Sequence, residues 1–84
     1  MIVYILATCV PGNEKEVISK IKSLSEVVEV NGVMGRYDIF IKVSADSPPT
    51  VDSAITKIRS IPHITSTFTM SAIYGQGGTI DEEK

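Results

Sequence analysis

The 84-residue sequence predicts one α+β domain, a four-stranded antiparallel sheet with two helices on one of its faces. Three observations support this prediction. Segments with helical apolar periodicity alternate with segments of strand periodicity in the order βαββαβ. A short internal repeat relates the two halves of the chain. The length allows only one small core, because a chain of this size buries little more than ~60% of its unfolded surface.

The first half predicts a strand, a helix and a second strand. Residues 1–9 are β-branched or aromatic and apolar on both alternating faces, which is typical of a central strand covered on both sides. Residues 13–24 predict an amphipathic helix whose apolar stripe consists of Val17, Ile18, Ile21 and Leu24. Residues 27–33 predict the next strand, whose polar and apolar faces are formed by Glu29 with Asn31 and by Val28 with Val30.

Two positions compete for the turn that follows. Asn31-Gly32 is a hairpin dipeptide, and Gly35 also offers the backbone freedom that a tight connection needs. We favour a turn at residues 34–36. From Tyr37 to Val43 every second residue is apolar, so residues 37–45 predict a third strand antiparallel to the second. The turn then presents polar side chains at the mouth of a strand.

The second half repeats the pattern. Residues 46–49 combine a capping residue with two prolines, which suits a helix start, and the apolar stripe that follows consists of Val51, Ala54, Ile55 and Ile58. The helix ends near Ser60. Residues 64–74 alternate strictly and predict the fourth strand, with one face rich in hydroxyl groups. Residues 75–84 are glycine-rich and then acidic, so we expect a mobile tail unless a partner orders it.

The repeat places residues 20–24 on residues 57–61, and the same spacing aligns Ile2 with Ile39 and Leu6 with Val43. Two tandem strand–helix–strand units give the ferredoxin-like arrangement. Its second sheet face carries no helix. Since 43% of the residues are hydrophobic, more than a small monomer needs, we expect an oligomer in which a partner sheet covers residues such as Val3, Ile5 and Phe40.

Composition excludes several classes of function. A net charge of −2 and a pI near 5.2 leave no basic face for direct nucleic-acid binding. The longest apolar run is too short to span a membrane, and one cysteine forms no intrachain disulfide, so we expect a cytoplasmic protein. Cys9 and His63 form no recognisable nucleophile–base or metal-ligand set. We therefore expect no catalytic residues, metal or cofactor.

Three motifs, in this order and separation, give the chain a family resemblance. They are Pro11-Gly12 before an acidic helix, Gly35-Arg36-Tyr37-Asp38-Ile39 leading into Val43, and the run from Ile61-Pro62-His63-Ile64 through Thr65-Ser66-Thr67-Phe68-Thr69-Met70. From about Val3 to Ile73 the chain resembles the C-terminal effector-binding domain of the Lrp/AsnC family, the RAM module (regulation of amino-acid metabolism). Because the sequence begins at the first strand, we expect a stand-alone RAM protein without a helix-turn-helix.

The resemblance implies dimers whose sheets pack face to face, rings built from these dimers, and an amino acid or similar effector bound in the cleft between dimers. It implies regulation of transcription by co-assembly with full-length family members, and no enzymatic activity. Carried over by position, the effector site consists of Met34, Gly35, Arg36, Tyr37, Asp38, Ser66, Thr67 and Thr69. These residues suit a zwitterion: Asp38 accepts from its ammonium group, while turn amides, Arg36 or threonine hydroxyls donate to its carboxylate.

Simpler interpretations stand beside this one. An aspartate beside a turn often only accepts hydrogen bonds from nearby backbone, and threonines suit the solvated face of any strand. Tyr37 is as well suited to interface packing. At the level of function, the same topology serves small enzymes of the dimeric α+β barrel type, and a purely protein-binding module is a third alternative.

Overall fold

The computed structural model describes residues 1–78 and contains the expected order of elements. They are β1 (Ile2–Cys9), α1 (Glu14–Lys22), β2 (Val27–Gly32), β3 (Ile39–Ser44), α2 (Pro48–Arg59) and β4 (Ile64–Ser71). Of the expected tail, residues 79–84 lie outside the described part of the chain. The predicted third and fourth strands were too long, since β3 covers Ile39–Ser44 rather than residues 37–45 and β4 ends at Ser71 rather than at Tyr74.

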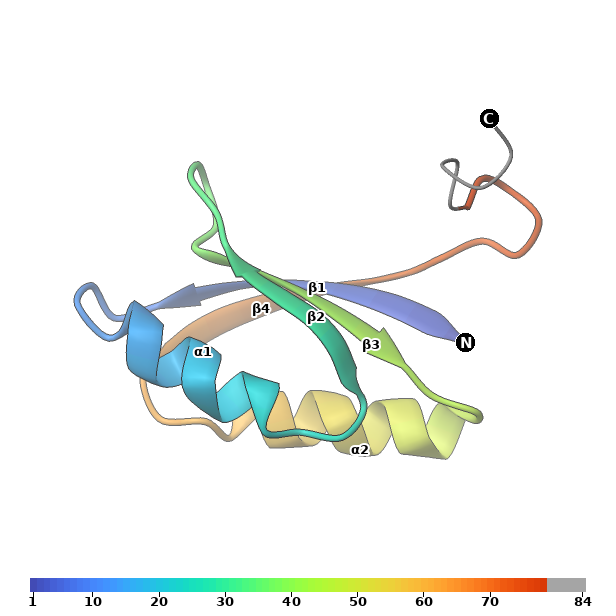
Figure 1. The fold of residues 1–84 in the computed structure, drawn as a ribbon, viewed down its shortest axis with the longest axis horizontal. Coiled ribbons are helices and arrows are strands. Elements are labelled where there is room, and N and C mark those ends of the chain that lie inside the picture. The colour runs from blue at the N-terminus through green and yellow to red at the C-terminus, as the bar shows by residue number, and fades with distance from the viewer. Residues whose placement is uncertain (79–84) are drawn as a thin grey trace.

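The strands form one antiparallel sheet in the order β2-β3-β1-β4. Figure 1 shows both helices beneath the same face of this sheet. We call the other side the open face. The arrangement is the predicted ferredoxin-like sandwich, and it leaves β2 and β4 as edge strands.

The core lies between the sheet and the helices. Inward-facing side chains of β1 and β3 meet the apolar stripes of α1 and α2 there, and the fully buried set comprises Val3, Ile5, Ala7, Val17, Ile21, Ile39, Ile41, Val43, Ala54 and Ile58. No polar or charged residue among residues 1–78 is fully buried. The helix stripes predicted from apolar periodicity are confirmed, because these residues pack against the sheet.

The local sequence explains how the helices begin and end. Both acidic residues of the first turn of α1 and both lysines of its last turn complement the helix dipole. The helix α2 begins after Ser47 with Pro48 and Pro49, whose backbones carry no N–H group to be capped. None of the helices within residues 1–78 is long and apolar enough to cross a membrane.

One prediction about the sheet faces was wrong. Val3 and Ile5 are fully buried beneath the helices rather than on the open face. The open face of β1 carries the alternate residues, Ile2, Tyr4, Leu6 and Thr8, each partly exposed. Phe40 does lie on the open face, where its ring stacks on that of Tyr4 with 5.8 Å between centroids. β1 is apolar on both faces, so its alternating pattern does not determine which face packs against the helices.

A second correction concerns β2. The register between β2 and β3 shifts between Val27 and Glu29, where the strand bulges. Val30 packs against the core as predicted, but Val28 is 56% exposed. The repeat holds for the helices, because Ile21 and Ile58 are both fully buried. It fails for the strands, since it aligns the core residue Ile39 with the open-face residue Ile2.

Candidate functional site

The connection between β2 and β3 projects from one end of the sheet. It comprises residues 33–38, because β2 continues through Asn31 and Gly32, and it is closed by a hydrogen bond of 2.9 Å from Val33 N–H to the Asp38 carbonyl. Gly35 has a φ of 136°, which side chains rarely allow. The turn is therefore in the favoured place, with Met34 at 96% exposure and Arg36 also exposed.

Asp38 anchors this connection to β1. Its N–H donates to the Ala7 carbonyl at 2.9 Å, and its carboxylate Oδ2 accepts from the Cys9 N–H at 3.0 Å. Asp38 therefore does accept a hydrogen bond from backbone, as the simpler interpretation proposed. The donor belongs to β1, which is distant in the sequence, and not to the turn itself. A carboxylate accepts several hydrogen bonds, so its partly exposed side chain retains acceptor capacity.

Tyr37 and Ser66 lie toward the same end of the open face. The Tyr37 ring stacks on that of Phe68 from β4, with 6.4 Å between the centroids. The Thr8 hydroxyl lies 2.5 Å from the hydroxyl of Ser66 and 2.7 Å from that of Thr65. The fold therefore brings a tyrosine, a carboxylate and several hydroxyls to one end of the sheet. We call this set the polar corner; it consists of Thr8, Tyr37, Asp38, Thr65 and Ser66.

The predicted site residues did not include three contributors to this region, Thr8, Thr65 and Phe68. Thr8 carries the one aliphatic hydroxyl of β1, and its position near the strand end is the signal that would have identified it. Phe68 is an exposed aromatic residue on a strand otherwise rich in hydroxyls. Thr8 and Phe68 lie on the open face in register, since Leu6 pairs with Phe68 and Thr8 with Ser66.

Thr67 and Thr69 lie away from Tyr37 and Asp38 of the polar corner. They pair with the buried-face residues Ala7 and Ile5, so their side chains point to the helix side of the sheet. There they line a shallow groove of about 490 Å³ with Ile55 and Arg59 of α2. Thr65 and Ser66 of the polar corner also border this groove. The predicted site residues therefore form two groups within one chain.

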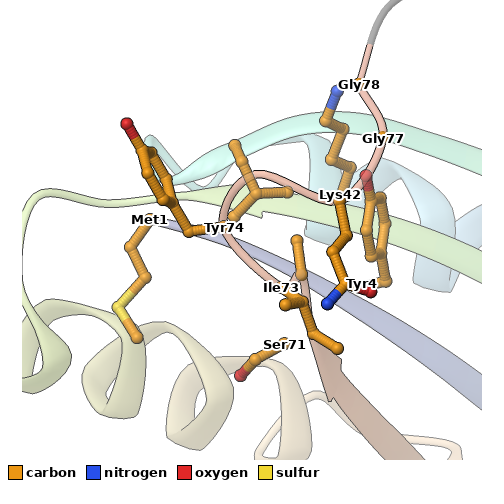
Figure 2. A pocket seen from close by; sticks show the side chains of 11 residues that line it. Met1, Tyr4, Lys42, Ser71, Ile73, Tyr74, Gly77 and Gly78 are labelled. Carbon is orange, nitrogen blue, oxygen red and sulfur yellow. The ribbon is translucent and has the colours of Figure 1, made fainter.

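A larger cavity lies at the opposite end of β1. It has a volume of about 970 Å³ and lies between the sheet and residues 73–78. We call residues 72–78 the C-terminal arm; Ala72 N–H still donates to the Ile2 carbonyl of β1. Figure 2 shows Tyr4 and Lys42 of the sheet beside the labelled arm residues. Residues 34–38 line neither this cavity nor the groove.

Cys9 and His63 are the two residues considered for catalysis. Their backbone segments are neighbours, but their side chains are not joined by a hydrogen bond. Val10 N–H donates to the His63 carbonyl at 2.9 Å, yet the His63 imidazole Nε2 faces Glu16 Oε2 at 3.7 Å. Cys9 is buried, and burial raises the pKa of its thiol, with the negative charges of Glu14 and Asp38 acting in the same direction. Within residues 1–78 no group of three or more His, Cys, Asp or Glu side chains is arranged to hold a metal ion.

The fold and these clusters describe a ligand-binding domain, with polar groups held at the end of a rigid sheet. The model of the Lrp/AsnC ligand binding domain matches residues 2–74, and the chain belongs to this family of transcriptional regulators. The chain is 31% identical over 70 residues to the HTH-type transcriptional regulator FL11 of Pyrococcus horikoshii, covering 83% of this chain and 46% of FL11. It thus spans about half the length of the curated relatives it matches.

Solved structures share the fold. The hypothetical protein PHS023 from Pyrococcus horikoshii superimposes with a TM-score of 0.82 and 40% identity, over 90% of this chain and 94% of that chain. The transcriptional regulator NMB0573 from Neisseria meningitidis, solved as a complex with L-Met, gives a TM-score of 0.79 over 93% of this chain and 53% of that chain. Its identity is 10%, so this likeness concerns the fold alone.

Proposed function

We propose that the chain is a non-enzymatic, cytoplasmic module that binds an amino acid and regulates transcription through assembly with DNA-binding members of its family. The observation that carries the proposal is the polar corner, whose carboxylate is anchored at a sheet end beside a protruding turn. Membership of the ligand-binding-domain family supports it. The complex of NMB0573 with L-Met is a further support, since that regulator has the same fold.

The chemistry of the corner suits a zwitterion. The ammonium group of an amino acid binds the remaining acceptor sites of Asp38, and the guanidinium of Arg36 or the Ser66 hydroxyl donates to its carboxylate. Gly35 exposes the turn backbone to the ligand. Met34, fully exposed at the tip, contacts the ligand side chain.

In this proposal, Thr67 and Thr69 contact a ligand that is bound at the polar corner of another chain. Because they lie on the helix side, they do not reach a ligand bound at the corner of their own chain. A ligand bound between subunits contacts the turn of one chain and the hydroxyls of another. This explains why the proposed site requires an assembly, as expected for a ring of dimers.

The dimer itself forms through the open face in this proposal. Phe68 and Met70 are 51% and 38% exposed there, next to the stacked rings of Tyr4 and Phe40. An apolar surface of this kind on a small domain is stabilised when a second copy covers it. The isologous contact of two such faces gives a sheet-to-sheet sandwich.

The test is thermal unfolding monitored against each of the twenty amino acids at millimolar concentration. A ligand that binds only the native state stabilises it by about 2.7 kcal/mol at a hundred times its Kd, so the melting temperature rises. The matched control is the N-acetyl derivative of any active amino acid, which lacks the ammonium group and is expected to produce no shift. If no amino acid shifts the melting temperature of the assembled protein, the proposal is wrong.

A further inference from the structure

β4 forms one edge of the sheet, and the backbone along this edge is free. Ala72 N–H donates to the Ile2 carbonyl, which makes these two residues a hydrogen-bonded pair in register with β1 and β4. Such pairs alternate along an antiparallel ladder, so the even-numbered residues of β4 bond to β1. The N–H and C=O groups of Thr67, Thr69 and Ser71 therefore point away from the sheet, where no further strand lies within residues 1–78.

The edge of β4 lacks the features that usually protect a free edge. Natural edge strands are blunted by lysine, proline, a bulge or short length. The sequence of β4, Ile64–Ser71, contains neither a charged residue nor a proline, and its irregular register is confined to the start, opposite Thr8 and Cys9. The other edge strand, β2, bulges between Val27 and Glu29 and carries the charge of Glu29. The edge of β4 is therefore the one that accepts a further strand.

The groove beside this edge selects the side chains of such a strand. It has a volume of about 490 Å³, and the hydroxyls of Thr67 and Thr69 line it together with Ile55 and Arg59 of α2. Within residues 1–78, Arg59 is the one charged residue of the groove, and no salt bridge joins its guanidinium to a carboxylate. A guanidinium binds a carboxylate through two parallel hydrogen bonds. The groove therefore suits an extended segment that presents an acidic and an aliphatic side chain on this side.

No strand in the described part of this chain meets that requirement. β1, β3 and β4 contain no acidic residue, and β2 contains only Glu29. Glu29 pairs with Lys42, which lies beside Tyr4 on the open face, and it directly follows the bulge. β2 of a second copy, added to β4 with its helices on the same side, thus offers neither a regular edge nor a carboxylate near Arg59. The charge of the groove favours a strand from a different protein.

We propose that the edge of β4 binds an extended acidic segment of a different protein, which adds as a fifth strand and directs a carboxylate to Arg59. Its backbone pairs with Thr67, Thr69 and Ser71, and this pairing supplies affinity for an extended chain. Its alternate side chains are apolar, because they lie next to Phe68, which is 51% exposed on the open face. The proposal does not rest on amino-acid binding at the polar corner. Both use the hydroxyls of Thr67 and Thr69, so a bound segment and a ligand held by another chain exclude each other there.

The first experiment titrates the full chain with a peptide as long as β4, with blocked ends and alternating threonine and valine, in which glutamate replaces one central threonine. A tryptophan at one end reports binding by fluorescence anisotropy, because the chain contains no tryptophan. We expect the glutamate peptide to bind at least about tenfold more tightly than its lysine counterpart, and Arg59→Glu to reverse this preference. Lys15→Glu, an exposed charge reversal outside the groove, is expected to keep it. Equal binding of the two peptides to the parent chain would overturn the inference.

The second experiment tests the backbone pairing. Thr69→Pro removes an N–H that points away from the sheet, so the pairing with β1 is kept, and Thr69→Ala is its matched control. We expect only the proline variant to lose peptide affinity, at least about tenfold, with its circular dichroism unchanged.

Should Thr69→Pro fail to fold, two peptides N-methylated at alternate residues replace it as the test. One of them is expected to lose binding because its N-methyl groups face β4, and the other is expected to bind; equal binding of both would contradict the proposal. If no peptide binds and Thr69→Pro dissociates an oligomer, another copy of the chain occupies the edge and the proposal is wrong.

Discussion

The carboxylate of Asp38 accepts a hydrogen bond of 3.0 Å from the backbone N–H of Cys9, which joins the β2–β3 connection to the end of β1. Together with the bond from Asp38 N–H to the Ala7 carbonyl, it fixes the position of the polar corner. The Asp38 side chain thus has a structural role, and the proposed function adds a ligand-binding role. Two substitutions of Asp38 separate these roles.

Asp38→Ala removes both the acceptor and the charge, and Asp38→Asn removes only the charge. We expect Asp38→Ala to lower the free energy of unfolding by about 1–3 kcal/mol, because a hydrogen bond to a charged group is lost and a backbone donor is unpaired. Asp38→Asn keeps an oxygen for the Cys9 N–H and costs less. Both variants are expected to abolish the amino-acid-induced rise in melting temperature and leave the oligomer intact. Binding retained by Asp38→Asn would show that the ammonium group is recognised elsewhere.

Phe68 provides a test of the open face. Its side chain is 51% exposed, so Phe68→Ser is expected to change the unfolding free energy of the monomer little. In the proposed dimer the ring is buried, and its loss weakens association at least about tenfold. Sedimentation over a concentration series measures this effect, with urea unfolding at low protein concentration as the stability control. An unchanged dimer would exclude this face as the interface.

Glu26 gives the stability a defined dependence on pH. Backbone hydrogen bonding and then Lys57, whose Nζ lies 3.3 Å from Glu26 Oε2, lower the pKa of this carboxyl below its ordinary value of 4.5. A lowered folded-state pKa means that the stabilisation is present above about pH 4.5 and is lost as the pH falls through the folded value. Urea unfolding at several pH values is expected to show a smaller acid loss for Glu26→Gln than for the parent. Parallel curves would contradict this role.

The helices and the element order were predictable because each helix buries one stripe. The period that places Ile21 and Ile58 in the core is visible without any tertiary information. The orientation of β1 was not predictable in this way. Both of its faces are apolar, and only the packing of α1 and α2 decides that Val3 is buried and Tyr4 is not. The bulge that exposes Val28 likewise depends on pairing with β3.

The candidate site was predictable only in part, because Tyr37, Asp38 and Ser66 were expected in it but Thr8 and Thr65 were not. Gly35 lies in the expected turn, whereas Asp38, expected in the third strand, lies in the connection before β3. The hydroxyls of β4 alternate, so Ser66 and Thr67 necessarily point to opposite faces. Which of them joins the turn depends on the face that α2 covers. The link from Asp38 to Cys9 spans residues far apart in the chain and leaves no local pattern.

The reactivity of the Cys9 thiol reports whether the junction between Asp38 and the end of β1 is closed. The Cys9 side chain is buried at 6% exposure, and burial together with the charges of Glu14 and Asp38 raises the pKa of the thiol above 9.0. A thiol reagent therefore meets little thiolate at pH 8 and reaches the sulfur only when the end of β1 opens. We expect the native protein to react at least about a hundredfold more slowly than the urea-unfolded chain. Asp38→Ala, which releases the Cys9 N–H, is expected to accelerate the native reaction. A native rate equal to that of the unfolded chain would mean that the junction is open in solution.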